Sequence, residues 1–329
     1  MNLNLTKKHF AGIVFFMTVL LFAIFLRYLP IEVSGHPVGM SPTRVINSGF
    51  MALTTSIVFS ILLVILTKRD YVQAHLATVK RFRHLLVLMV KRDFITRYRK
   101  SVLGILWSML NPLLTMTVLV IVFSFLFRFD IPHFAVYVLS GQIIFMMFSE
   151  ATNNAMGSII ANAGIIKKVY VPKYIFPISK IVSSVVNFVF AFAAFLLVTF
   201  VTRAPLHWTI VLVPIPVIYT FMFALGMGML LSSMAVFFRD LQYIYGVAIT
   251  AWMFFTPIMY PVSILTEQVY HLMHLNPLFH YVSYFRALAL DGVIPGLWEN
   301  VICLGFGLFA MGLGLYTTIA NKDKYILYI

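Results

Sequence analysis

Long uninterrupted apolar runs are the feature that most constrains this chain. A helix needs about 20 apolar residues to cross roughly 30 Å of hydrocarbon. Of the 329 residues, 61% are hydrophobic and only 10% are charged, which is too few charges for a soluble domain. A β-barrel would show short alternating segments instead. The sequence therefore predicts an all-α polytopic membrane protein with about eight transmembrane helices: Phe10–Leu29, Val45–Leu66, Leu103–Phe127, Phe134–Met156, Ile175–Val201, Trp208–Phe238, Tyr243–Tyr260 and Val301–Ala320.

The distribution of basic residues predicts the orientation of these spans. Cytoplasmic loops of membrane proteins carry an excess of Lys and Arg. With the N-terminus in the cytoplasm, 19 of the 24 basic residues fall on the cytoplasmic side. We therefore expect both termini to be cytoplasmic. The basic residues left on the other side are Arg27, Arg44, Arg128, Arg203 and Arg286.

The order of the runs suggests three parts. Residues 1–70 form a two-helix membrane hairpin, which we expect to be retained because its first apolar run is too long for a signal peptide. Residues 71–102 form a cytoplasmic amphipathic interface helix, and residues 103–329 form a six-span core. Within this core, residues 257–295 combine four prolines with apolar pieces, which indicates extracytoplasmic re-entrant helices.

The segment KRDFITRYRKSVLGILWSMLNPL is a basic entry into the first core span. Apolar residues recur at helical spacing through this region: Val87 and Val90 before the segment, and Phe94 and Tyr98 within it. This pattern predicts a helix lying along the membrane interface. In one interpretation its basic residues only anchor the helix to anionic lipid. In the other they contact a phosphate group of a ligand, or a partner protein.

Polar residues inside the spans are costly and therefore informative. Glu150 lies in the second core span with no second intramembrane acid nearby, so we expect helix–helix hydrogen bonding rather than a proton relay. At a turn near the membrane edge, Arg239 and Asp240 are placed to form an ion pair. Aromatic side chains inside spans suit the apolar faces of sugar rings, and the candidate channel aromatics are Trp107, Tyr137 and Tyr219.

Several motifs of catalysis and cofactor binding are absent. The chain has no GxxxxGK[ST] phosphate loop, no HExxH and no GxSxG. His271 and His274 lie three residues apart without further ligands, which favours an interfacial helix over a metal site. The single Cys303 lies in an apolar run and cannot form an intramolecular disulfide. We expect no cofactor in this chain, no nucleic-acid partner and no enzymatic activity.

Taken together, five segments resemble the permeases of ABC-2 type exporters of polysaccharides such as O-antigen, capsule and teichoic acid. The segments are RDFITRYRKSVLGILWSMLNPL, IIKKVYVPKYIFPISK, FFRDLQYI, FFTPIMYPVSIL and NPLFHYVSYFRALAL. The resemblance covers roughly Arg81 to the C-terminus, and residues 1–70 depart from the usual pattern of the family.

The resemblance implies a homodimer in the bacterial inner membrane, docked on two copies of a cytoplasmic ATPase subunit that binds ATP and Mg²⁺. It also implies that the basic entry helix acts as a gate and that residues 257–295 lie near the exit. A cytoplasmic loop would couple the permease to the ATPase through Lys167, Lys168, Tyr170, Pro172, Lys173 and Tyr174.

For such an exporter, the expected substrate is a polysaccharide on a polyprenyl pyrophosphate. Its anionic head would contact Arg97, Arg99 and Lys100, because guanidinium groups suit phosphate oxygens. Phe94, Tyr98 and Trp107 would flank the lipid or the first sugars. Two other functions fit the sequence: an ABC-2 exporter of a small hydrophobic compound, and a membrane-embedded enzyme that modifies glycans.

Overall fold

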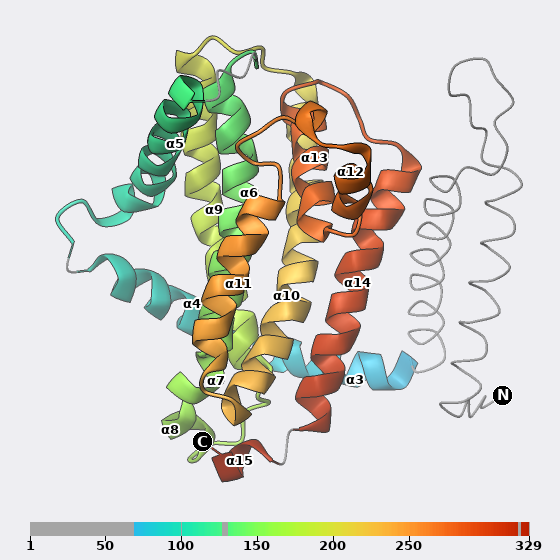
Figure 1. Ribbon diagram of the computed structural model, residues 1–329. Helices are drawn as coiled ribbons and strands as arrows, with labels where there is room; N and C mark the ends of the chain where they lie inside the picture. The colour runs from blue at the N-terminus through green and yellow to red at the C-terminus, as the bar shows by residue number, and fades with distance from the viewer. Residues whose placement is uncertain (1–68, 100, 127–130, 322–323, 329) are drawn as a thin grey trace, which may run out of the picture.

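The computed structural model describes residues 69–99, 101–126, 131–321 and 324–328. The predicted hairpin of residues 1–70 lies almost wholly outside these ranges. Within them the chain is helical and contains no strand. The long helices stand side by side in one bundle, and shorter helices lie at both ends of it (Figure 1).

Five helical segments in the described ranges are long and apolar enough to cross a membrane. This confirms the predicted class of helical membrane protein. Two of them, α6 (Phe134–Met156) and α9 (Ile175–Val201), have the predicted bounds. The other three are α5 (Trp107–Leu126) with the preceding 3₁₀ turn Gly104–Leu106, α10 (Pro214–Phe237) with the preceding turn Trp208–Leu212, and α14 (Leu297–Ala320).

The predicted span Tyr243–Tyr260 differs in the structure. Helix α11 covers Leu241–Phe255 and has only 15 residues. It ends before Pro257 because the residue that precedes a proline disfavours helical geometry, and Thr256 is indeed extended. At about 1.5 Å per residue, α11 is shorter than the hydrocarbon thickness. The total of eight spans therefore stays a prediction.

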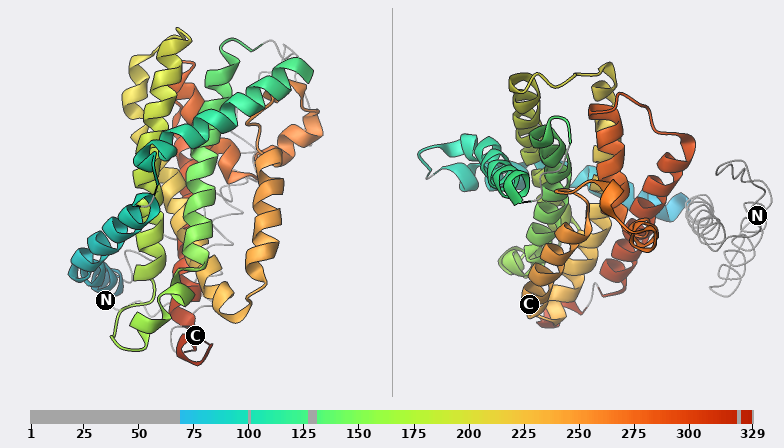
Figure 2. Two further views of the ribbon diagram at one scale, coloured as in Figure 1. Left: turned by 90° about the vertical axis from the view of Figure 1, so that its left-hand side faces the viewer. Right: turned by 45° about the horizontal axis from the view of Figure 1, so that its top comes forward.

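Helix α6 lies at the centre of the bundle. It packs against α5, α9, α10 and α13, and most of its residues between Val136 and Met156 are buried. Helix α5 is the opposite case, since it is inclined across the bundle and leaves most of its surface exposed (Figure 2). The carbonyl of its internal Pro112 accepts a hydrogen bond of 3.2 Å from the side-chain amide of Gln142 of α6.

Helices α10 and α14 make the closest long contact in the bundle. A Cβ atom on Gly226 of α10 would lie 2.0 Å from the carbonyl carbon of Ala310, and one on Gly314 would lie 2.2 Å from the oxygen of Gly226. Small residues that let two helix backbones approach are typical of membrane bundles. The glycines thus fix the distance between these two helices.

The basic segment before α5 forms two helices instead of one. Helix α3 covers Arg69–Arg81 and α4 covers Arg83–Tyr98, with a break at Phe82. They lie at one end of the bundle, which we call the α4 end, together with the short helices α7 (Ser158–Ala161), α8 (Ala163–Ile166) and α15 (Tyr325–Tyr328) (Figure 1).

Two short helices, α12 (Glu267–Met273) and α13 (Pro277–Ala289), lie near the opposite end of the bundle (Figure 1). Asn276 caps α13 by accepting a hydrogen bond of 3.0 Å from the Leu278 N–H. The buried Arg286 then ties α13 to its surroundings. It donates to Ser140 and Tyr137 of α6 and to the carbonyls of Pro257 and Ile258. That these helices are re-entrant stays a prediction.

Candidate functional site

A cavity of about 640 Å³ lies at the α4 end between α4, α5, α6 and α9, and we call it the first cavity. Arg97 and Tyr98 contribute from α4, and Glu150 from α6. Trp107, at the start of α5, also lines it and is 44% exposed. The cavity therefore lies where the basic entry helix meets three of the long helices.

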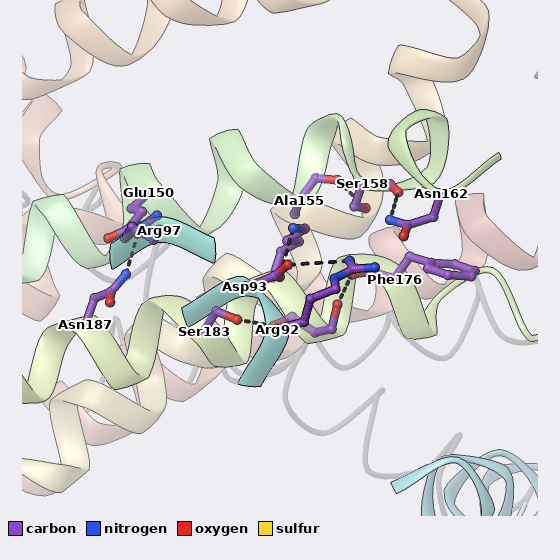
Figure 3. A network of polar contacts seen from close by, with 12 residues as sticks. Arg92, Asp93, Arg97, Glu150, Ala155, Ser158, Asn162, Phe176, Ser183 and Asn187 are labelled. Carbon is purple, nitrogen blue, oxygen red and sulfur yellow. Dashed lines mark hydrogen bonds and ion pairs between the residues drawn. The ribbon is translucent and has the colours of Figure 1, made fainter. Parts of the chain in front are cut away.

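An ion pair joins α4 to α6 inside this cavity. The guanidinium of Arg97 pairs with the carboxylate of Glu150, and the Asn187 amide of α9 donates a hydrogen bond of 2.6 Å to the same carboxylate (Figure 3). Burial opposes the charge on Arg97, but Glu150 and Tyr98 together outweigh it, so the pKa of Arg97 lies above its ordinary value. Arg97 is thus a permanent cation that already has an anionic partner.

Tyr98 and Phe94 strengthen the attachment of α4. The hydroxyl of Tyr98 bonds to Ser108 of α5 and donates to the amide oxygen of Asn187 at 3.3 Å. The ring of Phe94 stacks on Phe190 of α9 at a centroid distance of 6.0 Å and meets the edge of Tyr98 at 5.0 Å. Helix α4 is therefore held by polar contacts at its end and by aromatic contacts one turn earlier.

A second cavity of about 640 Å³ adjoins the first and lies between α4, α6 and α9. Lys180 of α9 pairs with Asp93 at 2.8 Å, and Arg92 approaches the same carboxylate at 3.5 Å. Arg97 also lines this cavity and is paired with Glu150, so three cations stand against two carboxylates. The second cavity consequently carries a net positive charge. It shares Arg97, Asn154 and Asn187 with the first cavity.

A third cavity, also of about 640 Å³, continues along α4 toward α3 and is almost wholly apolar. Val87, Val90 and Phe94 of α4 face Val182 and Val186 of α9. The exposed basic residues at its rim are Lys80, Arg83 and Lys91. The third cavity shares Val90, Phe94 and Val186 with the second, so the three cavities adjoin in sequence along one side of α4.

The other predicted head-group residues do not join this arrangement. Arg99 is exposed and lines none of the three cavities. Lys100 lies outside the described residues. Two of the predicted channel aromatics, Tyr137 and Tyr219, also lie elsewhere. The Tyr137 hydroxyl donates to the Tyr260 carbonyl at 3.1 Å, and the Tyr219 hydroxyl donates to Asn300 at 2.9 Å.

The predicted coupling segment follows α8 at the α4 end of the bundle (Figure 1). Lys167, Lys168 and Tyr170 are exposed, and Tyr170 is 90% exposed. The chain is non-helical from there until α9 begins at Ile175. The other members of the predicted set, Pro172, Lys173 and Tyr174, are half-buried.

The turn before α11 does not contain the predicted ion pair. Arg239 and Asp240 are both exposed, and no ion pair joins them in the described part of the chain. Their side chains are neighbours in sequence, and water already solvates both charges. The backbone carbonyl of Asp240 instead accepts bonds from the N–H groups of Tyr243 and Ile244.

No metal site is present in the ranges that the structure describes, because no three His, Cys, Asp or Glu side chains gather there. His271 lies on α12 beside Glu267, whose carboxylate is 3.8 Å from its Nε2 atom. The cavities thus offer cations, amides, hydroxyls and aromatic rings. These groups can bind a ligand.

Two residues that hold this site together were not singled out from the sequence. Asp93 bridges α4 and α9, and Asn187 links α4, α6 and α9. Asn187 did carry a signal, since it is a lone amide in the apolar run IVSSVVNFVFAFAAF. Asp93 carried a weaker signal, as the one acid in a strongly basic helix.

The part of the chain that runs from α4 through α13 is similar to known proteins. The family model described as ABC-2 type transporter matches residues 84–290, from α4 through α13. The O-antigen export system permease protein RfbA of Klebsiella pneumoniae is 30% identical over 232 residues, covering 70% of this chain and 88% of the relative.

Two further relatives are also similar to this chain. RfbA of Myxococcus xanthus is 31% identical over 201 residues, covering 60% of this chain and 77% of that protein. The polysialic acid transport protein KpsM of Escherichia coli is 26% identical over 236 residues, covering 68% and 88%. The match to the family model over most of the chain, together with these relatives, shows that this chain belongs to the ABC-2 type transporter family of membrane permeases.

Proposed function

We propose that this chain is the membrane subunit of an ABC exporter that moves a polysaccharide linked to a polyprenyl pyrophosphate out of the cytoplasm. Relatives named as O-antigen and polysialic acid transport proteins support a polysaccharide substrate. The observation that carries the proposal is the net positive charge of the second cavity, where three cations outnumber the two carboxylates that pair with them.

The chemistry of the second and third cavities suits a lipid-linked anion. Arg offers a planar pair of donors to phosphate oxygens, and Lys offers a compact charge. The adjoining third cavity is apolar and has Lys80, Arg83 and Lys91 at its rim. A hydrocarbon tail and a diphosphate therefore find suitable surfaces side by side along α4. Arg99 and Lys100 remain predicted outer contacts for the same head group.

The rest of the proposal follows from the family and from the distribution of charge. ATP is hydrolysed by a separate cytoplasmic subunit, and the permease works as a homodimer in the bacterial inner membrane. The α4 end faces the cytoplasm, which the positive-inside rule supports. The exposed Lys167, Lys168 and Tyr170 then contact the ATPase, whose movement is transmitted through α8 and α9.

A complementation experiment tests the proposal. Arg97→Gln combined with Lys180→Gln removes two of the three cations of the second cavity. We expect surface polysaccharide to fall at least about tenfold in a strain that carries this double variant, because charge-assisted contacts to phosphate are strong. Arg239→Gln, an exposed change that lines none of the cavities, serves as the control.

Membrane level and dimer formation are measured in the same strains, so that a loss of protein is not mistaken for a loss of transport. Wild-type export by a well-assembled double variant would overturn the assignment of the head group to this cavity.

A further inference from the structure

The first cavity has a different chemistry from the two beside it. Half of the residues that line it carry neutral polar groups: four side-chain amides, four hydroxyls from serine and one from Tyr98. The amides and serine hydroxyls come from Asn111, Asn153, Asn154, Asn187, Ser101, Ser108, Ser149 and Ser184.

The positive and negative charges that line the first cavity nearly neutralise each other. Arg97 and Glu150 are its two charged side chains, and they pair with each other. A phosphate entering here would meet the Glu150 carboxylate as well as Arg97. It finds a better environment in the second cavity, where Arg92 and Lys180 add two cations and Asp93 adds only one carboxylate. The first cavity is therefore suited to an uncharged polar group.

Two of the amides are available to such a group. Asn153 donates to the Ser149 carbonyl at 2.9 Å, and Asn187 is engaged with Glu150 and Tyr98. The side chains of Asn111 and Asn154 form no hydrogen bond with the described part of the protein. A side-chain amide offers both a donor and an acceptor, and a sugar hydroxyl needs both.

The volume of the first cavity and its exposed aromatic ring also suit a sugar. A volume of about 640 Å³ lies within the range of roughly 300–1,000 Å³ that small-ligand sites occupy. Trp107 is 44% exposed, so part of its ring is free to contact the apolar C–H face of a sugar. Neutral hydrogen-bonding groups beside an indole are a suitable surface for a pyranose ring.

Position links this cavity to the proposed phosphate contacts. Arg97, Asn154 and Asn187 belong to both the first and the second cavity. Along α9, the first cavity is reached at Asn187, Phe188 and Ala191, deeper in the bundle than Lys180 of the second. A molecule with its phosphate at Lys180 and Arg97 thus places the next group in the first cavity.

We propose that the first cavity binds the sugar that is attached directly to the phosphate of the substrate, through the amides of Asn111 and Asn154 and the ring of Trp107. This inference rests on the proposed function and adds to it the place and chemistry of sugar recognition. It makes α4 the element along which tail, phosphate and first sugar are bound in order.

Binding to the purified full-length chain tests the proposal, without need of the ATPase. Native mass spectrometry in detergent micelles gives the dissociation constants of two probes: bare undecaprenyl diphosphate, and undecaprenyl diphosphate carrying a short glycan from the host strain. The compared proteins are the wild type, Asn111→Ala with Asn154→Ala, and Thr117→Ala. Thr117 is an exposed residue of α5 whose hydroxyl bonds to its own helix.

We expect the wild type and Thr117→Ala to bind the glycan-bearing lipid more tightly than the bare lipid. The double Asn variant should lose about tenfold or more of that preference, since two hydrogen bonds are removed. Asn111→Ser and Asn154→Ser, measured singly, guard against an effect of altered folding and should each show a smaller loss.

Three results would overturn the inference. A wild type that binds both lipids equally shows that the sugar is not recognised here, and leaves the proposed function intact. A double Asn variant with the wild-type preference places sugar recognition elsewhere in the protein. A wild type that binds neither lipid removes the proposed function and this inference together.

Discussion

The close packing of α10 on α14 makes a prediction with a matched control on the same helix. Gly226→Ala and Gly314→Ala each add one methyl group where the two backbones meet. Gly312→Ala adds the same group to α14 at a position with nothing within 4 Å. The three variants thus share their chemistry and differ in the space available.

The magnitude follows from the distances. A Cβ atom added at Gly226 would lie 2.0 Å from the backbone of Ala310, whereas ordinary contact begins at 3.4 Å. The difference requires the helices to move apart by about 1.4 Å, and the obstacle is backbone that cannot rotate away. A radial gap of about 1 Å already forfeits up to half of a dispersion contact.

Overpacking of this kind costs about 3 kcal/mol, and the higher helix propensity of Ala returns about 1 kcal/mol. We expect a net loss of about 2 kcal/mol for Gly226→Ala, and a similar loss for Gly314→Ala. Gly312→Ala should be neutral or stabilising by up to about 1 kcal/mol.

Thermal unfolding of the detergent-solubilised protein, followed by tryptophan fluorescence, measures these differences. We expect the midpoint to fall by on the order of 5 °C for Gly226→Ala and Gly314→Ala, and to stay level or rise for Gly312→Ala. Equal midpoints for all three variants would refute the argument, because they would show that the two backbones do not meet at these glycines.

Three further predictions concern polar groups. Glu150→Gln leaves Arg97 without its carboxylate, so the binding of bare undecaprenyl diphosphate should tighten several-fold; weaker binding in the lipid assay would contradict this. Arg286→Met removes the guanidinium that donates to Tyr137, Ser140, Pro257 and Ile258. We expect thermal unfolding to show a loss of stability of about 3 kcal/mol or more, and Arg286→Lys to recover only part of that stability. Burial lowers the pKa of His280 to about 4 in the folded protein. Between about pH 6.5 and pH 4 the unfolded chain therefore binds more protons than the folded one, and the free energy of unfolding should fall as the pH drops through this range. A His280→Gln variant with the same pH profile as the wild type would show that another group is responsible.

Sequence patterns predicted the long elements well where apolar runs have clear ends. The bounds of α6 and α9 were as predicted, because polar or proline-containing segments flank both runs. The predicted end of the segment Tyr243–Tyr260 was wrong, because the helix stops at Phe255, before Pro257. The amphipathic segment was also broken in two at Phe82, where no proline or glycine gave a signal.

The candidate site was predicted only in part. Arg97, Tyr98, Phe94 and Trp107 do lie at cavities beside α4. The ionic partner of Arg97 could not be predicted, since Glu150 lies on another helix and only the packing of α4 near α6 brings them together. For the same reason the sequence could not show that the ring of Tyr137 lies against Arg286.

The location of the polysaccharide in cells that lack this chain tests the central claim most directly. A glycan-specific probe is applied to intact cells and to opened cells, with a complemented strain as the control. An exporter changes where the glycan is, and leaves its structure as it was. We predict lipid-linked polysaccharide of normal structure, trapped inside the cells and detected only after they are opened. Polysaccharide at the surface in normal amount would contradict the proposed function and would direct attention to export of a small hydrophobic compound.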